Sequence, residues 1–221
     1  MLDIEFVYPS YHKDTTKLRE LQRVFMEKFF TEQQRDFNPK TAIDSLTVIM
    51  QSYYDSIFTS EVQNIYTSGD SVPVYYLNIK NEVVFNDNKI ISFLVENEGY
   101  EGGAHPSHET EGYIYNVDDQ IFINENDIEG TNYKKNIAEI LYLKIKEQYC
   151  KKGEKPEDIG FDKNEIIPNN NLTVNEKGIT YHYNEYEIAP YYLGNINIFI
   201  PFNELEIYLK AGNPIEYLYN K

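Results

Sequence analysis

The stretch Glu98-Gly99-Tyr100-Glu101-Gly102-Gly103-Ala104-His105-Pro106-Ser107-His108-Glu109 lies just before the middle of a 221-residue chain. Its adjacent glycines, Gly102 and Gly103, can adopt backbone angles that are closed to other residues. Pro106 fixes its own φ and restricts the residue before it, His105. The stretch therefore predicts a shaped loop or bulge that connects two strands, and the rest of the chain is arranged on either side of it.

Upstream of this stretch, the hydrophobic pattern predicts a strand, two helices and a pair of strands. Apolar and polar residues alternate in the first segment, and apolar residues recur at helical spacing in the next two. Asp14 and Asn38 are of the residue types that cap helices, and Pro39 suits a first helical turn. The expected elements are a strand at 2–8, a helix from Asp14 to about residue 30, a helix from Asn38 to Phe58, and two strands, one opened by Pro73 and one covering 89–97.

Downstream of the stretch, strands alternate with one long helix. That helix has a continuous apolar face, a Thr131 or Asn132 cap and Gly153 as a stop signal. The expected elements are strands at 110–116 and 120–124, a helix at 131–149, a polar surface connection at 151–170, strands at 172–174, 179–183 and 196–200, and a short helix at 202–209. This order predicts an α+β fold in which antiparallel sheets pack with helices, two of them N-terminal and one long and central.

The charge of the chain limits its partners. Its 20 basic and 36 acidic residues give a net charge of −16. Such a chain would be repelled by nucleic acid and by anionic membranes, whereas a basic protein or cations would be attracted. We therefore expect no nucleic-acid partner.

The cysteine content and the hydropathy exclude further classes. Cys150 is the only cysteine, so neither an internal disulfide nor a cysteine-based metal site can form. No run approaches the roughly 18 apolar residues of a membrane helix. Met1 is followed by a strand-like pattern rather than by an export signal, which indicates either a cytoplasmic protein or a mature part whose signal has been removed.

A metal-assisted enzyme is one alternative for the central stretch. Glu101, His105, His108 and Glu109 are of ligand type and close in sequence. Their order matches neither form of the helical zinc-protease motif, and Pro106 argues against a helix interior. The grouping therefore leaves a metal-assisted hydrolase or a glycan-acting enzyme as an alternative, while the pattern favours histidines that hydrogen-bond the loop.

Other catalytic patterns are missing from the sequence. Ser107 adjoins His108, but adjacent residues rarely reach triad geometry, and no Gly-x-Ser-x-Gly elbow occurs. Cys150 follows the C-terminus of a predicted helix, where the dipole disfavours a thiolate. Gly102-Gly103 lacks the spacing of a phosphate-binding loop. We therefore predict no catalytic residue, no metal and no cofactor.

A second distinctive segment is rich in tyrosine. Five tyrosines fall between residues 181 and 192, together with His182, Glu185 and Glu187. Pro190 and Gly194 indicate a shaped excursion between two strands. The segment is either an aromatic patch buried over the sheet or a surface of tyrosines and acids that binds a partner.

The two segments together resemble a known pattern. They are Tyr100-Glu101-Gly102-Gly103-Ala104-His105-Pro106 and the longer segment 183–205, which begins Tyr183-Asn184-Glu185-Tyr186-Glu187-Ile188-Ala189-Pro190-Tyr191-Tyr192-Leu193-Gly194. The pattern resembles the paired domains of unknown function in the RsiV anti-sigma factor ectodomain and in the non-catalytic region of PdaC-type peptidoglycan deacetylases. The resemblance covers roughly residues 2–210.

The resemblance implies a location, a ligand and a division of the chain. It implies an extracytoplasmic protein, periplasmic or a cell-surface lipoprotein with its signal removed, and in the RsiV branch it implies binding of lysozyme. It also implies an N-terminal helix-plus-hairpin half at 1–106 and a C-terminal RsiV-like half at 107–221, packed together as one unit.

These observations lead to one preferred function. We expect a non-catalytic extracytoplasmic module that binds a basic protein such as lysozyme, or a cell-wall component; a structural domain of an envelope assembly is a further alternative, and the oligomeric state is open. The expected ligand-binding residues are Tyr100, Glu101, His105, His108, Tyr186, Glu187, Tyr191 and Tyr192. The expected structural motif is Gly102, Gly103, Ala104, His105 and Pro106.

Overall fold

The structure is a computed structural model that describes residues 1–68 and 75–220, with side chains left undescribed for residues 57–68. Pro73, which was predicted to begin a strand, lies outside the described residues, and so does the side chain of Phe58, the predicted end of the second helix. The remaining expectations can be compared with the observed elements.

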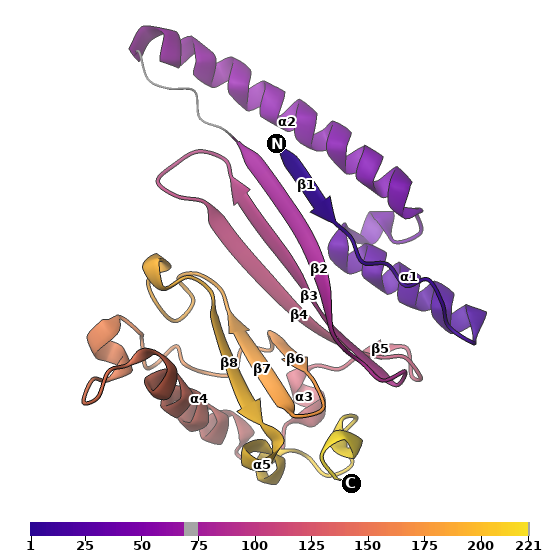
Figure 1. Cartoon of the computed structure of the whole chain (residues 1–221), viewed down its shortest axis with the longest axis vertical. Helices are drawn as coiled ribbons and strands as arrows, with labels where there is room; N and C mark the ends of the chain where they lie inside the picture. The colour runs from indigo at the N-terminus through magenta and orange to yellow at the C-terminus, as the bar shows by residue number, and fades with distance from the viewer. Residues whose placement is uncertain (69–74, 221) are drawn as a thin grey trace. The chain divides into compact units, whose positions relative to one another are not determined.

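The chain folds into a mixed α+β structure, as predicted (Figure 1). The strands are β1 (Leu2–Glu5), β2 (Tyr76–Asn86), β3 (Ile90–Tyr100), β4 (Ser107–Asn116), β5 (Ile121–Phe122), β6 (Leu172–Val174), β7 (Gly178–Tyr183) and β8 (Ile196–Pro201). The α-helices are α1 (Thr15–Phe29), α2 (Pro39–Ser68), α3 (Glu125–Ile128), α4 (Tyr133–Tyr149) and α5 (Phe202–Leu205). Short 3-10 helices are η1 (Glu32–Gln34), η2 (Pro156–Ile159), η3 (Tyr191–Leu193), η4 (Glu206–Tyr208) and η5 (Glu216–Leu218).

Within the described residues, the strands form two sheets, ordered β1-β2-β3-β4-β5 and β6-β7-β8. The second sheet is antiparallel throughout, as is the β4–β5 pair. The expectation of antiparallel sheets is wrong for one pair: β1 runs parallel to β2, with Leu2 opposite Leu77. A parallel pair needs a long crossover connection, and α1 and α2 supply it.

By their contacts, the residues divide into two units. Unit 1 comprises Met1–Lys80 and Asn97–Ser107, and unit 2 comprises Asn81–Glu96 and His108–Lys221. The part of the β2–β3 hairpin nearest its turn, Asn81–Glu96, therefore belongs to unit 2. The chain passes from unit 1 to unit 2 for the last time between Ser107 and His108. The division into halves at residues 106 and 107 stays a prediction.

Unit 1 is built on α1, which begins as the sequence predicts. The Asp14 side chain accepts a hydrogen bond of 2.8 Å from the backbone N–H of Thr16, and so satisfies one of the free donors of the first turn. The apolar face of the helix is buried through Leu21, Val24, Phe25, Met26 and Phe29. The first strand ends earlier than predicted, at Glu5, but its two faces alternate as expected.

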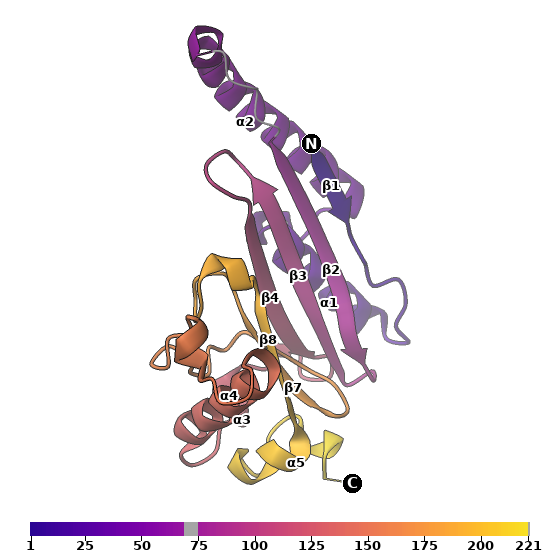
Figure 2. The same ribbon diagram turned by 60° about the vertical axis from the view of Figure 1, so that its left-hand side comes forward.

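Unit 2 is built around α4, which lies along β8 (Figure 2). The buried face of α4 is Tyr133, Ile137, Leu141 and Ile145, as the periodicity predicts. The predicted side-chain cap is wrong in detail: Asn132 occupies the cap position in the left-handed region, with φ of 60°, and its side chain makes no capping bond. A left-handed cap residue aims its side chain away from the free N–H groups of the first turn.

The connection at 151–170 is not purely a surface segment, contrary to its polar composition. Phe161 and Ile166 are 3% and 1% exposed and belong to the core of unit 2. Two isolated apolar residues show no helical or strand periodicity, so the pattern could not mark them as core. They anchor the segment against the body of unit 2.

The central stretch forms the loop that its composition predicts. Strand β3 continues to Tyr100, further than the predicted residue 97, and β4 begins at Ser107. Between them, Gly102 and Gly103 have φ angles of 93° and 103°, a region that disfavours side chains. The Gly-Gly pair therefore provides the bend between two strands.

Candidate ligand-binding surface

The loop of residues 101–106 is held by its own hydrogen bonds. The Tyr100 hydroxyl donates to the carbonyl oxygen of Gly103 at 2.9 Å, and His105 Nδ1 lies 2.9 Å from the carbonyl oxygen of Pro106. The Tyr53 hydroxyl of α2 donates to a Glu101 carboxylate oxygen at 3.2 Å. This bond raises the pKa of Tyr53. Tyr100, Glu101 and His105 thus serve the structure of unit 1, and Ala104 and His105 are exposed.

Tyr100 also ends a row of stacked tyrosine rings. Its centroid lies 6.4 Å from that of Tyr75, which in turn lies 6.0 Å from that of Tyr54, with interplanar angles of 24° and 8°. Tyr75 is 7% exposed. The row packs the end of β3 against α2 within unit 1, so Tyr100 has a packing function that its position in a loop motif did not indicate.

In unit 2, His108 forms part of a polar tether. Its Nδ1 lies 2.8 Å from one carboxylate oxygen of Glu185, and its backbone N–H donates to the other at 3.3 Å. The Glu185 side chain is 9% exposed, whereas that of His108 is 39% exposed. His108 therefore fastens the segment after β7 to the start of β4, across 77 positions in the sequence.

Asparagines complete the tether. The backbone N–H of Thr110 donates to Asn184 Oδ1 at 2.7 Å, and Asn195 Nδ2 donates to the Thr110 hydroxyl at 3.0 Å. Asn171 spans two groups of β4: its Oδ1 accepts from the N–H of Gly112 and its Nδ2 donates to the carbonyl of Thr110, both at 2.7 Å. Sequence reasoning missed these residues, because isolated asparagines in turns carry no signal for a distant partner.

We expect Asn171→Ala to lower the free energy of unfolding by about 1–2 kcal/mol, because the backbone N–H of Gly112 loses its 2.7 Å acceptor, while the Thr110 carbonyl keeps the longer bond of 3.3 Å from Asn184 Nδ2. Equilibrium urea unfolding of the full chain measures this loss. Asn164→Ala removes an exposed asparagine of the same unit and is the matched control, with an expected change below about 0.5 kcal/mol. Equal effects of the two substitutions would show that the tether contributes no stability.

Glu187 is also used within the segment. One carboxylate oxygen accepts from the backbone N–H of Asn184 at 2.9 Å, and the other from Asn169 Nδ2 at 2.7 Å. These bonds close the turn that follows β7. Glu187, predicted as a ligand-binding residue, therefore holds the turn in shape.

The five tyrosines of this region divide into two groups. Tyr181 and Tyr183 lie in β7 and are 0% and 1% exposed. Tyr186 and Tyr192 are 64% and 71% exposed, and the Tyr191 ring lies 5.9 Å from that of Tyr186. We call Tyr186, Tyr191 and Tyr192 the tyrosine face. The tyrosines of the strand therefore form a buried patch, whereas on the loop Tyr186 and Tyr192 are exposed and Tyr191 is half-buried.

A buried carboxyl group lies beneath this region, in the core of unit 2. Glu125 of α3 is 4% exposed and accepts a 2.7 Å hydrogen bond from the Tyr181 hydroxyl, which is 2.6 Å from the Tyr133 hydroxyl. Burial raises the pKa of Glu125, and the bond from Tyr181 opposes that shift. Sequence reasoning missed both Glu125 and α3, because a single helical turn is too short to show a periodic pattern.

His182, next to Tyr181, is buried with both ring nitrogens occupied. Its Nδ1 lies 2.7 Å from Asn197 Oδ1, and its Nε2 lies 2.9 Å from the Thr173 hydroxyl. Burial lowers the pKa of His182, and the contact with Asn197 opposes that shift. The ring is therefore a neutral, hydrogen-bonded part of the core.

In the part of the chain that the structure describes, no three histidine, cysteine, aspartate or glutamate side chains gather as a metal-binding group. The predicted alternative set is divided between the units: Glu101 and His105 belong to unit 1, and His108 and Glu109 belong to unit 2.

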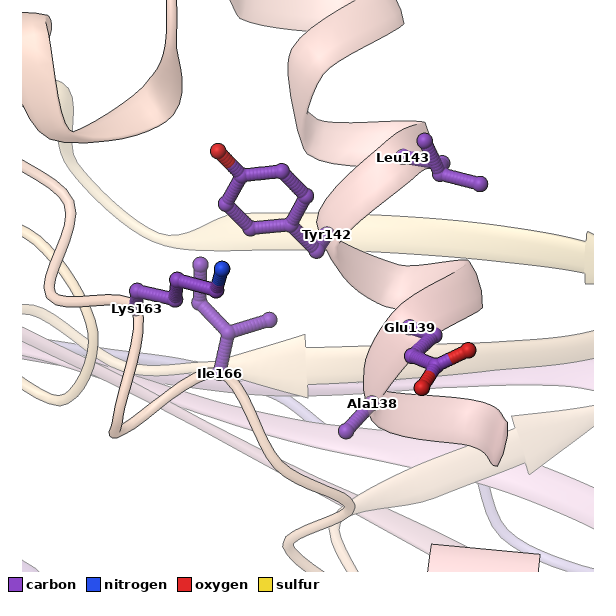
Figure 3. Close-up of a pocket in the computed structure, with 6 residues that line it drawn as sticks. All are labelled: Ala138, Glu139, Tyr142, Leu143, Lys163 and Ile166. Atoms are coloured by element: carbon purple, nitrogen blue, oxygen red, sulfur yellow. The ribbon is translucent and has the colours of Figure 1, made fainter. Parts of the chain in front are cut away.

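A groove lies between α4 and the segment that follows η2, within unit 2 (Figure 3). It has a volume of about 320 Å³ and is lined by Ala138, Glu139, Tyr142, Leu143, Lys163 and Ile166. The first four residues come from α4, and the other two come from the segment that follows η2. Lys163 Nζ lies 5.0 Å from the centroid of the Tyr142 ring, whose hydroxyl donates to Glu157 at 2.9 Å. The sequence did not single out any of these residues.

Part of the chain matches the model of a known family. The model of the family "Protein of unknown function (DUF3298)" matches residues 119–203, all within unit 2. No curated protein sequence matches the chain. The expectation of a domain of unknown function is therefore confirmed, whereas the likeness to RsiV and PdaC proteins stays a prediction.

Two solved structures share the fold. A DUF3298 family member from Bacteroides fragilis NCTC 9343 aligns with a TM-score of 0.82 and 24% identity, covering 100% of this chain and 88% of its own. A DUF3298 family protein from Pseudomonas aeruginosa PAO1 aligns with a TM-score of 0.52 and 14% identity, covering 69% of each chain. At these identities the likeness shows the fold alone. In the residues described, no helix is long and apolar enough to cross a membrane.

Proposed function

We propose that this chain is a non-catalytic binding module of the cell envelope, and that its ligand is a basic protein of the lysozyme type. The observation that carries the proposal is the tyrosine face, which is exposed although the segment that bears it is firmly tethered. The resemblance of the sequence to RsiV-type ectodomains supports the extracytoplasmic location and the choice of lysozyme as the first ligand to test.

The tether makes the tyrosine face suitable for recognition. Glu185, Asn184 and Asn195 fix the loop to β4, so the exposed rings lose little conformational freedom when a ligand binds. Tyrosine rings give a large contact area with a polar tip, and they are enriched in protein interfaces. A face of this kind favours binding over a packing function alone.

The charge of the chain fits the proposed ligand. A net charge of −16 attracts a basic partner over several ångströms and speeds its encounter. Such steering weakens as salt shortens the Debye length from about 14 Å at 0.05 M to about 4 Å at 0.5 M. Salt sensitivity therefore distinguishes this mode of binding from a purely apolar one.

We expect calorimetric titration of the full chain with lysozyme to show binding at low salt that weakens as salt is raised. Tyr186→Ala should weaken binding about tenfold, because truncating a central aromatic contact costs on the order of 1–2 kcal/mol. Tyr11→Ala, which removes an 83% exposed tyrosine of unit 1, is the matched control and should leave the affinity unchanged. Absence of heat at tens-of-micromolar concentrations, or equal losses in both variants, would count against the proposal.

A further inference from the structure

The segment that lines the groove opposite α4 is hydrogen-bonded to the loop that carries the tyrosine face. The backbone N–H of Asp162 donates to the carbonyl of Ile188 at 2.9 Å, and the Tyr192 hydroxyl donates to the carbonyl of Ile159 at 2.7 Å. These bonds join the segment that forms one wall of the groove to the loop that carries the tyrosines.

A second, more polar hollow lies next to the groove. It has a volume of about 350 Å³ and is lined by Glu157, Gly160, Phe161, Asp162, Lys163 and Asn164. Lys163 lines both hollows, so its side chain forms the boundary between them. The polar hollow and the apolar groove are thus neighbouring sites of different chemistry that share Lys163.

The groove has the lining of a site for an apolar side chain. Ala138, Leu143 and Ile166 supply aliphatic surface, and Leu143 is 57% exposed. Burying such a surface is favourable, at about 25 cal/mol per Å² of apolar area removed from water. Small pockets that take an aliphatic or aromatic anchor are typical centres of protein interfaces.

The charges around the groove and the polar hollow favour a basic ligand. Glu139, Glu157 and Asp162 contribute three carboxylates, against the single ammonium group of Lys163 among the lining residues. The surrounding chain is strongly acidic as well. A polypeptide with lysine or arginine beside its apolar residue therefore meets complementary charge, whereas an acidic one is repelled.

We propose that the groove is a second contact site of the module, which takes an apolar side chain from a basic stretch of polypeptide. The inference rests on the proposed function and adds to it the chemistry of the bound segment. Lys163 acts as a selectivity residue at the boundary: its stem covers apolar surface, and its charge moderates the attraction for basic ligands.

Short peptides test the groove independently of lysozyme. The full chain, isotopically labelled, is titrated with acetyl-Lys-Lys-Phe-Lys-Lys-amide and followed by amide chemical shifts. We expect the shifts to concentrate on residues 138–143 and 163–166. Replacing Phe by Ala in the peptide should weaken binding at least about tenfold, since the peptide then loses the burial of its aromatic side chain. The acidic counterpart Glu-Glu-Phe-Glu-Glu should not bind.

Two variants of the protein sharpen the test. Lys163→Met keeps an apolar stem and removes the charge, so it should raise the affinity for the basic peptide about two- to fivefold, as expected for an exposed charge. Leu143→Ser should lower the affinity, whereas Ile207→Ser, which alters a 76% exposed aliphatic residue outside the groove, should not. Shifts that fall elsewhere, equal binding of the Phe and Ala peptides, or weaker binding by the Lys163→Met variant would overturn the inference. Because no lysozyme is present, failure here leaves the lysozyme result to be judged separately.

Discussion

Gly178→Ala is expected to destabilise the protein by about 3 kcal/mol or more, because the added methyl group collides with the backbone of the neighbouring strand. A Cβ atom at this position would lie 2.2 Å from the carbonyl oxygen of Ile200 and 2.8 Å from the Cα of Pro201. Gly178 is paired with Pro201 in the β7–β8 ladder, so moving the two strands apart to relieve the collision would weaken the hydrogen bonds of the ladder. Equilibrium urea unfolding, followed by circular dichroism, measures the effect.

Gly99→Ala is the matched control for this prediction. It also lies in a strand, β3, but its added Cβ atom would meet only ordinary contacts, at 3.4 Å from the Tyr76 carbonyl oxygen and 3.6 Å from a Leu77 methyl group. We expect a change within about 1 kcal/mol, the span of strand preferences. Comparable losses at the two glycines would mean that glycine in these strands matters for another reason than the close approach at Ile200.

The second large effect is expected from Tyr181→Phe, which removes the hydroxyl group between Glu125 and Tyr133. The buried carboxyl group then loses the donor at 2.7 Å, and the Tyr133 hydroxyl loses its partner at 2.6 Å. We expect a loss of about 2–4 kcal/mol, the range for buried polar groups that are left without partners. A loss below about 1 kcal/mol would show that neither group depends on Tyr181.

The same network predicts a pH dependence with a definite sign. Burial raises the pKa of Glu125, and the hydrogen bond from Tyr181 opposes the shift. The contribution of Glu125 to stability is therefore present in full below its unfolded pKa of about 4.3, and is lost as the pH rises through the higher folded pKa. Glu125→Gln removes this titration, so its stability relative to the wild type should increase as the pH rises from below about 4.3 towards neutral.

The comparison with Glu125→Gln also separates the titration of Glu125 from that of His182, which affects stability in the opposite direction. Burial lowers the pKa of His182, with the Asn197 contact opposing the shift, so the contribution of His182 is present above its unfolded pKa of about 6.5 and is lost as the pH falls. That effect is common to the wild type and the Glu125→Gln variant and cancels in their difference. A difference in unfolding free energy that stays constant from acid to neutral pH would contradict the assignment to Glu125.

Local chemistry explains which parts of the fold could be predicted. Asp14 caps α1 because its side chain needs only the N–H groups of the next residues. The Gly102-Gly103 bend and the buried face of α4 follow from backbone freedom and from helical periodicity. The β1–β2 pairing could not be anticipated in the same way, because strand direction is set after α1 and α2 have been placed.

The candidate site shows the same limit more strongly. The sequence indicated the tyrosine-rich segment, but not which of its tyrosines are exposed, since β7 takes Tyr181 and Tyr183 into the core and leaves Tyr186 on the loop. The sequence favoured a hydrogen-bonding function for His108 and left a metal ligand as an alternative, but only the fold shows that its partner is Glu185. The α4 groove combines residues about 20 positions apart, and nothing in their local pattern joins them.

By itself, then, the sequence determined the acidic charge, the presence of α1, α2 and α4, the buried faces of α1 and α4, the Gly-Gly bend, and the presence of one segment rich in acids and histidines and another rich in tyrosines. These properties depend on single residues or on spacings within one element. Only the tertiary structure decided the function of each polar side chain in those segments. The Glu98–Glu109 stretch, with three acids and two histidines, became a bend whose His108 fastens a distant loop. The physical reason is that a hydrogen bond or an ion pair needs two groups within about 3 Å, and for partners far apart in sequence only the folded chain sets that distance.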